Sequence, residues 1–181
     1  MNVLAIAASN SRNSINHQLA AYTAGQVPGA QVDVLDINDF EMALFSVDRE
    51  AETGHPEQAH AFLARIGEAD ALVISFAEHN GSFSAAWKNL VDWASRIERA
   101  VFQDKPALFL ATSPGAGGAK NVLAAAEASA RYFSAELVGS LSVPAFHDNF
   151  DAAAGEANNP ELQAEIERLA QQLSATLERT G

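Results

Sequence analysis

Short apolar runs alternate with amphipathic stretches along this chain, and no other feature of the sequence limits its possible folds as strongly. The runs at residues 71–77 and 107–112 are nearly all apolar, which is typical of central strands in a parallel sheet covered on both faces. Further strands are expected at 1–8, 31–37 and 136–143, and helices at 16–24, 56–66, 84–101, 121–133 and along the C-terminal stretch. This alternation predicts one α/β domain over residues 1–181, a doubly wound parallel sheet of five strands with helices on both faces.

Charge and composition narrow the function classes. The chain carries 11 basic and 23 acidic side chains, a formal net charge of −12, so we expect neither nucleic acid nor an anionic membrane surface as a partner. It has no cysteine, which excludes disulfides, thiolate nucleophiles and iron–sulfur clusters. No apolar run approaches the roughly 20 residues of a membrane span. No basic region precedes the first apolar run, so we expect no signal peptide and a cytoplasmic protein.

Two stretches lie outside the five expected strands. In the C-terminal stretch, Asn159 is suited to be the N-cap and Pro160 the first residue of a helix. One face of that helix is apolar: Leu162, Ile166, Leu169, Leu173 and Leu177. The acidic segment 36–60 has little periodicity, and we expect a long connection there, a solvated excursion in preference to a lid.

Ligands of doubly wound sheets bind where the strands end, so the loops after the first, third and fourth strands are the ones to inspect. The first loop, residues 9–16, has six hydroxyl or amide side chains in eight positions, more than ordinary helix capping needs. Its hydroxyls, one guanidinium and the following helix N-terminus predict a phosphate site. The candidate residues are Ser9, Ser11, Arg12, Ser14, Ile15 and Asn16.

The other two loops are less informative when taken alone. After the third strand, Asn80-Gly81 predicts a tight turn, with His79 and Glu78 beside it as exposed side chains. After the fourth strand, residues 112–119 include three glycines, which allow the backbone to approach a flat ligand closely but also suit a flexible turn.

The stretch 78–96 resembles the signature of the NADPH-dependent FMN reductase family, Pro-Glu-Tyr-Asn-x-Ser-x-Pro-Gly-x-Leu-Lys-Asn-x-x-Asp-Trp-x-Ser-Arg. The matching residues are Glu78, Asn80, Ser82, Lys88, Asn89, Asp92, Trp93, Ser95 and Arg96. The first loop is similar to the family's Gly-Ser-x-Arg-x-x-Ser-x-Asn, and residues 113–118 are similar to its Ser-x-Gly-x-x-Gly-Gly. Ala77 stands where the family has Pro, His79 where it has Tyr, and Arg12 lies one position later than its Arg. These departures leave the nucleotide preference and the electron acceptor open.

The resemblance implies a flavodoxin-like sheet of order 2-1-3-4-5 and an FMN-dependent oxidoreductase. Such an enzyme takes hydride from NADPH or NADH and passes electrons to a small flavin, quinone or similar flat acceptor. It needs no catalytic side chain and no metal, because the flavin carries the chemistry. In addition to the residues of the first loop, the resemblance implies nine FMN-binding residues: Glu78, His79, Asn80, Gly81, Ser82, Ser113, Gly115, Gly117 and Gly118. The alternatives are a one-electron carrier like flavodoxin, which the acidic charge suits, and a non-catalytic FMN-binding or regulatory module.

The expected helix at 84–101 has an apolar arc wider than one sheet-facing stripe needs. The stripe itself contains Trp87, Leu90, Val91, Ala94, Ile97 and Val101. Ala86, Trp93 and Ala100 extend it to one side, and an uncovered flank of this kind predicts a homodimer or homotetramer that buries it. The resemblance points to the same helix between subunits, and the alternative cover is the chain's own segment 36–60.

Overall fold

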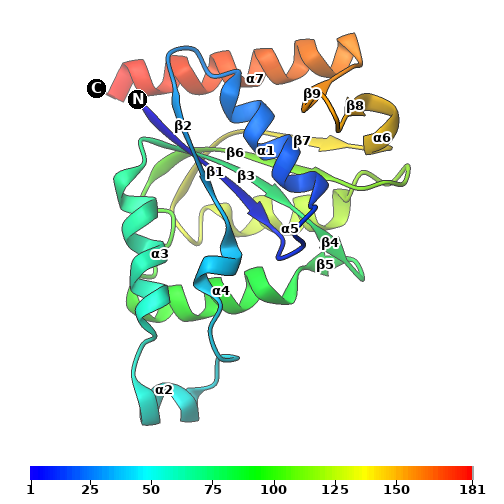
Figure 1. Cartoon of the computed structure of the whole chain (residues 1–181). Coiled ribbons are helices and arrows are strands. Elements are labelled where there is room, and N and C mark those ends of the chain that lie inside the picture. The colour runs from blue at the N-terminus through cyan, green and yellow to red at the C-terminus, as the bar shows by residue number, and fades with distance from the viewer. Residues whose placement is uncertain (181) are drawn as a thin grey trace.

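The computed structural model describes residues 1–180, and its centre is a parallel sheet of five strands (Figure 1). The strands are β1 (Asn2–Ala8), β2 (Gln31–Leu35), β3 (Ala71–Phe76), β6 (Lys105–Thr112) and β7 (Ala135–Val143). Their order is β2-β1-β3-β6-β7, which confirms the predicted order 2-1-3-4-5. All four pairings are parallel, so the strands end at one common edge, which we call the carboxyl edge; the opposite one is the amino edge.

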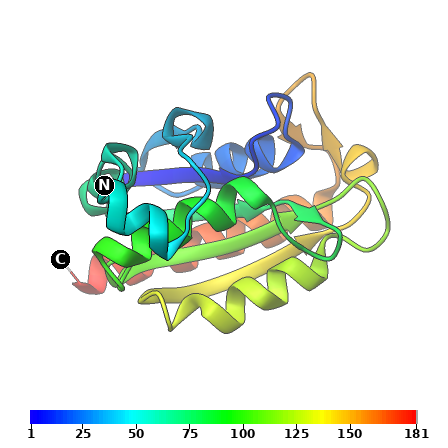
Figure 2. The ribbon, with the colours of Figure 1, turned by 90° about the horizontal axis from the view of Figure 1, so that it is seen from below.

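Helices cover both faces of this sheet, as Figures 1 and 2 show together. One face carries α1 (Ile15–Gly25) and α7 (Pro160–Thr180). The other face carries α3 (Glu57–Glu68), α4 (Ala85–Ile97) and α5 (Lys120–Ala130). Every residue of β3 is buried, which explains why its sequence is nearly all apolar rather than alternating.

The strands feed two separate cores through their alternating side chains. In β1, Val3 and Ala5 pack toward α1 and α7, whereas Leu4 and Ile6 pack toward the three helices of the other face. The C-terminal helix begins as predicted, because the Asn159 side chain accepts hydrogen bonds from the backbone N–H groups of Glu161 and Leu162, the second and third residues of α7. Within residues 1–180, no helix is both long and apolar enough to cross a membrane.

Segment 36–60, expected as a long solvated connection with little periodicity, contains more secondary structure than that expectation allows. This segment contains a 3-10 turn, η1 (Ile37–Phe40), the helix α2 (Val47–Thr53) and the start of α3. Side-chain caps begin the two short elements: Asp36 accepts from the N–H of Asn38, and Ser46 from that of Arg49. Hydrophobic periodicity cannot reveal such elements, because α2 buries none of its residues.

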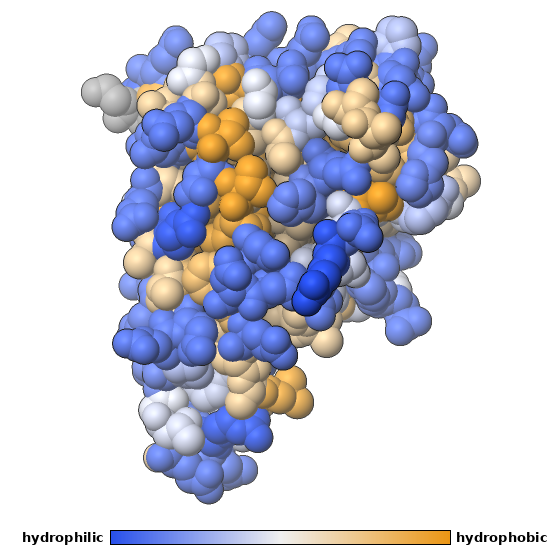
Figure 3. Space-filling model, in the orientation of Figure 1, coloured by the Kyte–Doolittle hydropathy of each residue, from blue (hydrophilic) through white to orange (hydrophobic). Residues whose placement is uncertain are grey.

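Residues 43–55, which include α2 and are called the α2 arm below, project from the body of the molecule at the bottom of Figure 1. The surface of the arm is largely hydrophilic (Figure 3). Leu44 and Val47 are apolar exceptions, 71% and 68% exposed. Arg96 of α4 holds the arm through hydrogen bonds to Glu50 (3.0 and 3.1 Å), and His55 contacts the same carboxylate. The hydrogen bond from Arg96, with a smaller contribution from His55, lowers the pKa of the Glu50 carboxyl.

The arm also covers the apolar flank of α4, so the predicted uncovered surface around Trp93 is wrong. Trp93 is 0% exposed, its indole N–H donates to the carbonyl of Ala43 (2.8 Å), and its ring packs edge to face on Phe45. Asn89 fixes the same segment by accepting from the N–H of Phe45 (2.8 Å). The helix itself is shorter than the predicted 84–101, because it ends at Ile97.

Candidate functional site

Three loops leave the carboxyl edge of the sheet, after β1, β3 and β6. The first leads into α1, the second contains a small hairpin of β4 (Glu78–His79) and β5 (Ser82–Phe83), and the third leads into α5. Because neighbouring strands are parallel and in register, these loops gather at one side of the molecule (Figure 1). All fifteen candidate binding residues lie on these loops or on the first residues of α1.

The loop after β1 presents hydroxyl groups around the start of α1. Ser9 and Ser14 are 6% and 7% exposed, whereas Ser11 is exposed. Ser14 is the N-cap of α1, yet its side chain makes no capping hydrogen bond. The N–H groups of Ile15 and Asn16, in the first turn, have no acceptor within the helix. Hydroxyl and N–H donors therefore remain available together at the positive end of the helix dipole.

A small hollow of about 50 Å³ lies beside these donors. Its lining is Ala7, Ser9, Ser11, Arg12, Ser14, His17, Leu35, Asp36 and Ile37. Within residues 1–180, the guanidinium of Arg12 forms no ion pair. The carboxylate of Asp36 accepts hydrogen bonds from the backbone and side chain of Asn38 (2.9 and 2.8 Å). Neither His17 nor Asp36 was identified from the sequence, since no local motif contains them.

The Asn16 side chain faces the protein rather than the hollow. Its Oδ1 accepts hydrogen bonds from the Ser75 hydroxyl (2.7 Å) and the Thr112 N–H (3.2 Å). Its Nδ2 donates to the Thr112 carbonyl (3.5 Å). The amide therefore ties the start of α1 to the ends of β3 and β6. Only the backbone N–H of Asn16 is left to serve a ligand.

The hairpin after β3 confirms the predicted tight turn. Asn80 and Gly81 both have positive φ values, 51° and 76°, which is the backbone of a two-residue type I′ turn. His79 pairs with Ser82 across the hairpin, and residues 79–82 are exposed. The turn thus presents backbone groups and short polar side chains to the space above the sheet.

Glu78 connects this hairpin to the third loop. Its carboxylate accepts from the backbone N–H of Val122 (2.9 Å) and from the Asn121 side chain (3.2 Å), both in the first turn of α5. The N-cap residue of α5 is Ala119, which offers no side-chain acceptor of its own. Glu78 therefore caps α5 from 44 residues away and joins two walls of the site.

The glycines of the third loop differ in how far the structure requires them. At Gly118, φ is +60° and an added Cβ would lie 2.4 Å from Ser142 Oγ and 3.0 Å from Pro144 N, so only glycine fits. At Gly115 and Gly117 a Cβ would meet open space. The Gly115 carbonyl accepts from the Ala145 N–H (2.9 Å) and the Ser113 hydroxyl (3.2 Å), which anchors the loop. The outer part of the loop is thus fixed in place but uncovered.

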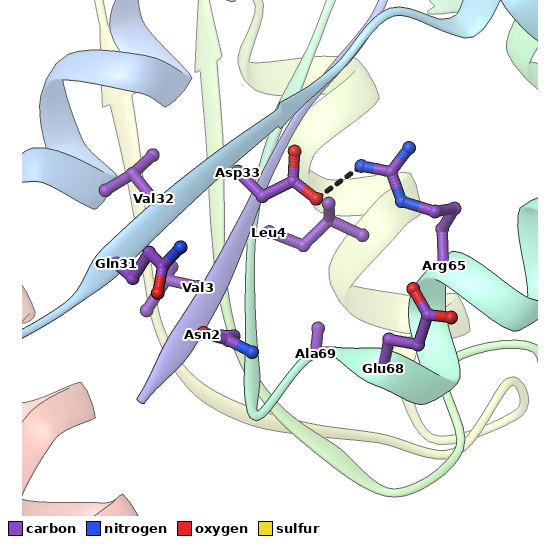
Figure 4. Close-up of a pocket in the computed structure, with 9 residues that line it drawn as sticks. All are labelled: Asn2, Val3, Leu4, Gln31, Val32, Asp33, Arg65, Glu68 and Ala69. Carbon is purple, nitrogen blue, oxygen red and sulfur yellow. Dashed lines mark hydrogen bonds and ion pairs between the residues drawn. The ribbon is translucent and has the colours of Figure 1, made fainter.

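The larger hollow shown in Figure 4 lies at the amino edge, away from these loops. It measures about 270 Å³ and is formed by the first residues of β1 and β2 and the last turn of α3. Arg65 and Asp33 form an ion pair across it, so each neutralises the other's charge. In residues 1–180, no three His, Asp or Glu side chains are grouped to hold a metal ion. The carboxyl edge, in contrast, keeps the Ser14 hydroxyl free of a capping bond and the Arg12 guanidinium free of an ion pair in residues 1–180.

Several known proteins are similar to this chain. A model of the family described as NADPH-dependent FMN reductase matches residues 1–149. An NADPH:quinone oxidoreductase of Arabidopsis thaliana is 38% identical over 99 residues, 55% of this chain and 49% of that protein. A 2-hydroxy-1,4-benzoquinone reductase of Burkholderia sp is 36% identical over 120 residues, 65% of this chain and 63% of that protein. An NAD(P)H-dependent FMN reductase of Pseudomonas aeruginosa is 35% identical over 117 residues, 64% of this chain and 62% of that protein.

The chain therefore spans between about half and two thirds of the length of these relatives. Among solved structures, an NAD(P)H:(acceptor) oxidoreductase flavoenzyme from Paracoccus denitrificans superposes with a TM-score of 0.77 over 98% of this chain and 97% of that one. At 23% identity, that likeness concerns the fold. The family match covers more than half of the chain, including all three loops of the carboxyl edge. The chain belongs to the NADPH-dependent FMN reductase family.

Proposed function

We propose that this chain is an FMN-dependent NAD(P)H oxidoreductase whose acceptor is a flavin, a quinone or a similar flat molecule. One observation carries the proposal: the three family loops lie on one edge, with the Ser14 hydroxyl free of any capping bond and Arg12 free of any ion pair in residues 1–180. Donors left without protein partners at a helix N-terminus fit a phosphate monoester.

The proposed FMN-binding residues divide into a phosphate group and a ring group. Hydroxyls of Ser9, Ser11 and Ser14, the guanidinium of Arg12 and the N–H groups of Ile15 and Asn16 would hold the phosphate. The ring would lie between the hairpin, with His79, Asn80, Gly81 and Ser82, and the glycine loop, with Ser113, Gly115, Gly117 and Gly118. Glu78 and the side chain of Asn16 would act as positioning groups, because their polar atoms are already bonded to the protein.

When bound, FMN supplies the hydride acceptance and electron transfer of the reaction. The protein's task is then to bind, to orient and to leave one ring face open. We propose no catalytic side chain. His79, which stands where the family has Tyr, would contribute its backbone in the hairpin rather than proton transfer. The quinone and FMN substrates in the relatives' names support a flat, small acceptor for this chain.

We further propose one domain over residues 1–181, of which residue 181 lies outside the described part, and a cytoplasmic location. A homodimer or homotetramer through residues 84–101 stays a prediction. Trp93 is buried within the chain and would not take part in that interface. The surface that α4 leaves for a partner contains Ala85, Lys88 and Arg96, which are exposed. Light scattering tests it: a particle of 19.2 kDa at micromolar concentration would contradict the oligomer.

The proposed activity is tested by loading the purified protein with FMN and recording NADPH and NADH oxidation with and without a benzoquinone. We expect quinone-dependent oxidation of at least one nucleotide, and His79→Tyr should retain turnover. FMN binding without oxidation of either nucleotide would support the one-electron carrier or the non-catalytic module instead. Failure to bind FMN would contradict the oxidoreductase, the one-electron carrier and the non-catalytic FMN-binding module alike.

A further inference from the structure

A second pocket lies in the helical layer, between α4 and α5. None of its lining residues belongs to the loop after β1 or to the loop after β6. Its volume is about 180 Å³. Six aromatic side chains line most of it: Phe76, Phe83, Trp87, Phe102, Phe109 and Phe133. Val91 and Ala126 complete the apolar part. This is the most aromatic surface of any hollow described above, and the proposed activity makes no use of it.

Lys88, Asp92 and Ser129, three of the few polar side chains at this pocket, already have partners. Lys88 Nζ donates to both carboxylate oxygens of Asp92 (2.6 and 2.8 Å), and the Ser129 hydroxyl donates to the Ala126 carbonyl (3.0 Å). Buried polar atoms without a partner in residues 1–180 occur only at Gln18 and Thr23, neither of which lines the pocket. An ordered water needs two to four polar partners, so the pocket offers water little and an apolar molecule much.

The aromatic walls support one another, which keeps the pocket from collapsing. Phe76 packs edge to face on Phe83, Trp87 and Phe109, with ring centroids 5.8, 5.7 and 5.2 Å apart. Phe102 is stacked on Trp87 and meets Phe133 edge to face. Rings held in this way by several neighbours cannot rotate into the space without losing those contacts.

We propose that this pocket is a binding site for an uncharged, single-ring apolar molecule. An engineered cavity of about 150 Å³ with an apolar lining binds benzene, and the pocket here is slightly larger. Lys88 and Asp92, the charged side chains of its lining, neutralise each other. Charged rings therefore find no free counter-charge in this pocket and fit poorly. The proposal is independent of FMN binding.

Phe83 links the pocket to the candidate site, because it also pairs with Glu78 in the hairpin. A bound ring would pack against Phe83 and support the hairpin from below. The ligand would thus touch the protein under the candidate site without entering it.

Fluorine NMR with fluorobenzene tests the proposal on the full chain without FMN. We expect one saturable site on the wild-type protein. Ala126→Leu, a substitution at a residue 1% exposed in the lining, should weaken binding at least about tenfold by filling the space. Ala125→Leu places the same side chain on an exposed position of α5 and should leave binding unchanged. Charged 4-fluorobenzoate should bind at least about tenfold more weakly than fluorobenzene.

Circular dichroism establishes that each variant is folded, and Ser129→Leu at the pocket mouth replaces Ala126→Leu if that variant is not. No saturable binding to the wild-type protein would overturn the proposal. Equal binding to the lining variant and the Ala125→Leu control would also overturn it, because the ligand would then lie elsewhere. Equal affinity for fluorobenzoate would overturn the assignment to uncharged rings.

Discussion

The two edges of the sheet differ in how they use their polar groups. At the amino edge Arg65 is paired with Asp33 across a hollow of about 270 Å³. At the carboxyl edge one hollow of about 270 Å³ lies between Asn10, η1 and the start of α4, and another of about 50 Å³ lies beside Ser14 and Arg12. There the Ser14 hydroxyl makes no capping bond and Arg12 has no ion pair in residues 1–180. The contrast shows why the proposed anion site rests on free donors and not on volume. A hollow whose charges neutralise one another has little left to offer an anion.

The largest change in FMN affinity is expected from Ser14→Asp, at the carboxyl edge. Aspartate is a good N-cap, so α1 should keep its stability. Its negative charge would occupy the place of the FMN phosphate, and we expect binding to weaken about 100-fold. Gln31→Asp, at an exposed position of the amino-edge hollow, is the matched control and should leave FMN affinity unchanged. FMN fluorescence titration measures both, and equal losses in the two variants would contradict the difference between the edges.

The next largest effect is a loss of stability, expected from a substitution in the glycine loop after β6. Gly118→Ala places a Cβ 2.4 Å from Ser142 Oγ at a φ of +60°, so it should lower the free energy of unfolding by about 2–3 kcal/mol. Gly117→Ala, one residue away in open space, should change it by less than about 0.5 kcal/mol. Urea denaturation followed by circular dichroism compares them. A Gly118→Ala protein as stable as the wild type would mean that the loop is not held against β7.

A smaller loss is expected from Glu78→Ala, which removes the cap of α5 and the link between two walls of the site. The cost in stability should be about 1 kcal/mol, with FMN affinity falling several-fold because the walls are no longer joined. Glu68→Ala, an exposed residue of the amino-edge hollow, is the control. If Glu78→Ala abolished FMN binding without loss of stability, Glu78 would be a ligand of the cofactor rather than a positioning residue.

The smallest effect is expected at the amino edge itself. Arg65→Met breaks an ion pair whose side chains are 35% and 55% exposed, so it should cost less than about 1 kcal/mol. FMN affinity should not change. Calorimetric titration with FMN checks this, and a clear loss of affinity would show that the amino edge takes part in binding.

The fold was predictable because strands buried on both faces, such as β3 and β6, have mostly apolar sequences. The Asn80-Gly81 turn was predictable because its backbone requires residues that tolerate positive φ. The cover over Trp93 was only an alternative to a partner subunit, since it comes from segment 36–60 and binds through a backbone carbonyl 50 residues away. Glu78 and Asn16 were identified as binding residues, but their partners lie 43 to 96 residues away, so the sequence could not reveal that their side chains are already bonded.

The most direct test of where the cofactor binds is an amide NMR titration of the ¹⁵N-labelled protein with FMN. We expect saturation at one equivalent, with the largest shifts at the N–H groups of residues 9–16, 79–82 and 113–118 and none at residues 31–33. Shifts concentrated at residues 2–4, 31–33 and 65–69 would place FMN at the amino edge and contradict the account, as would the absence of any saturable shift.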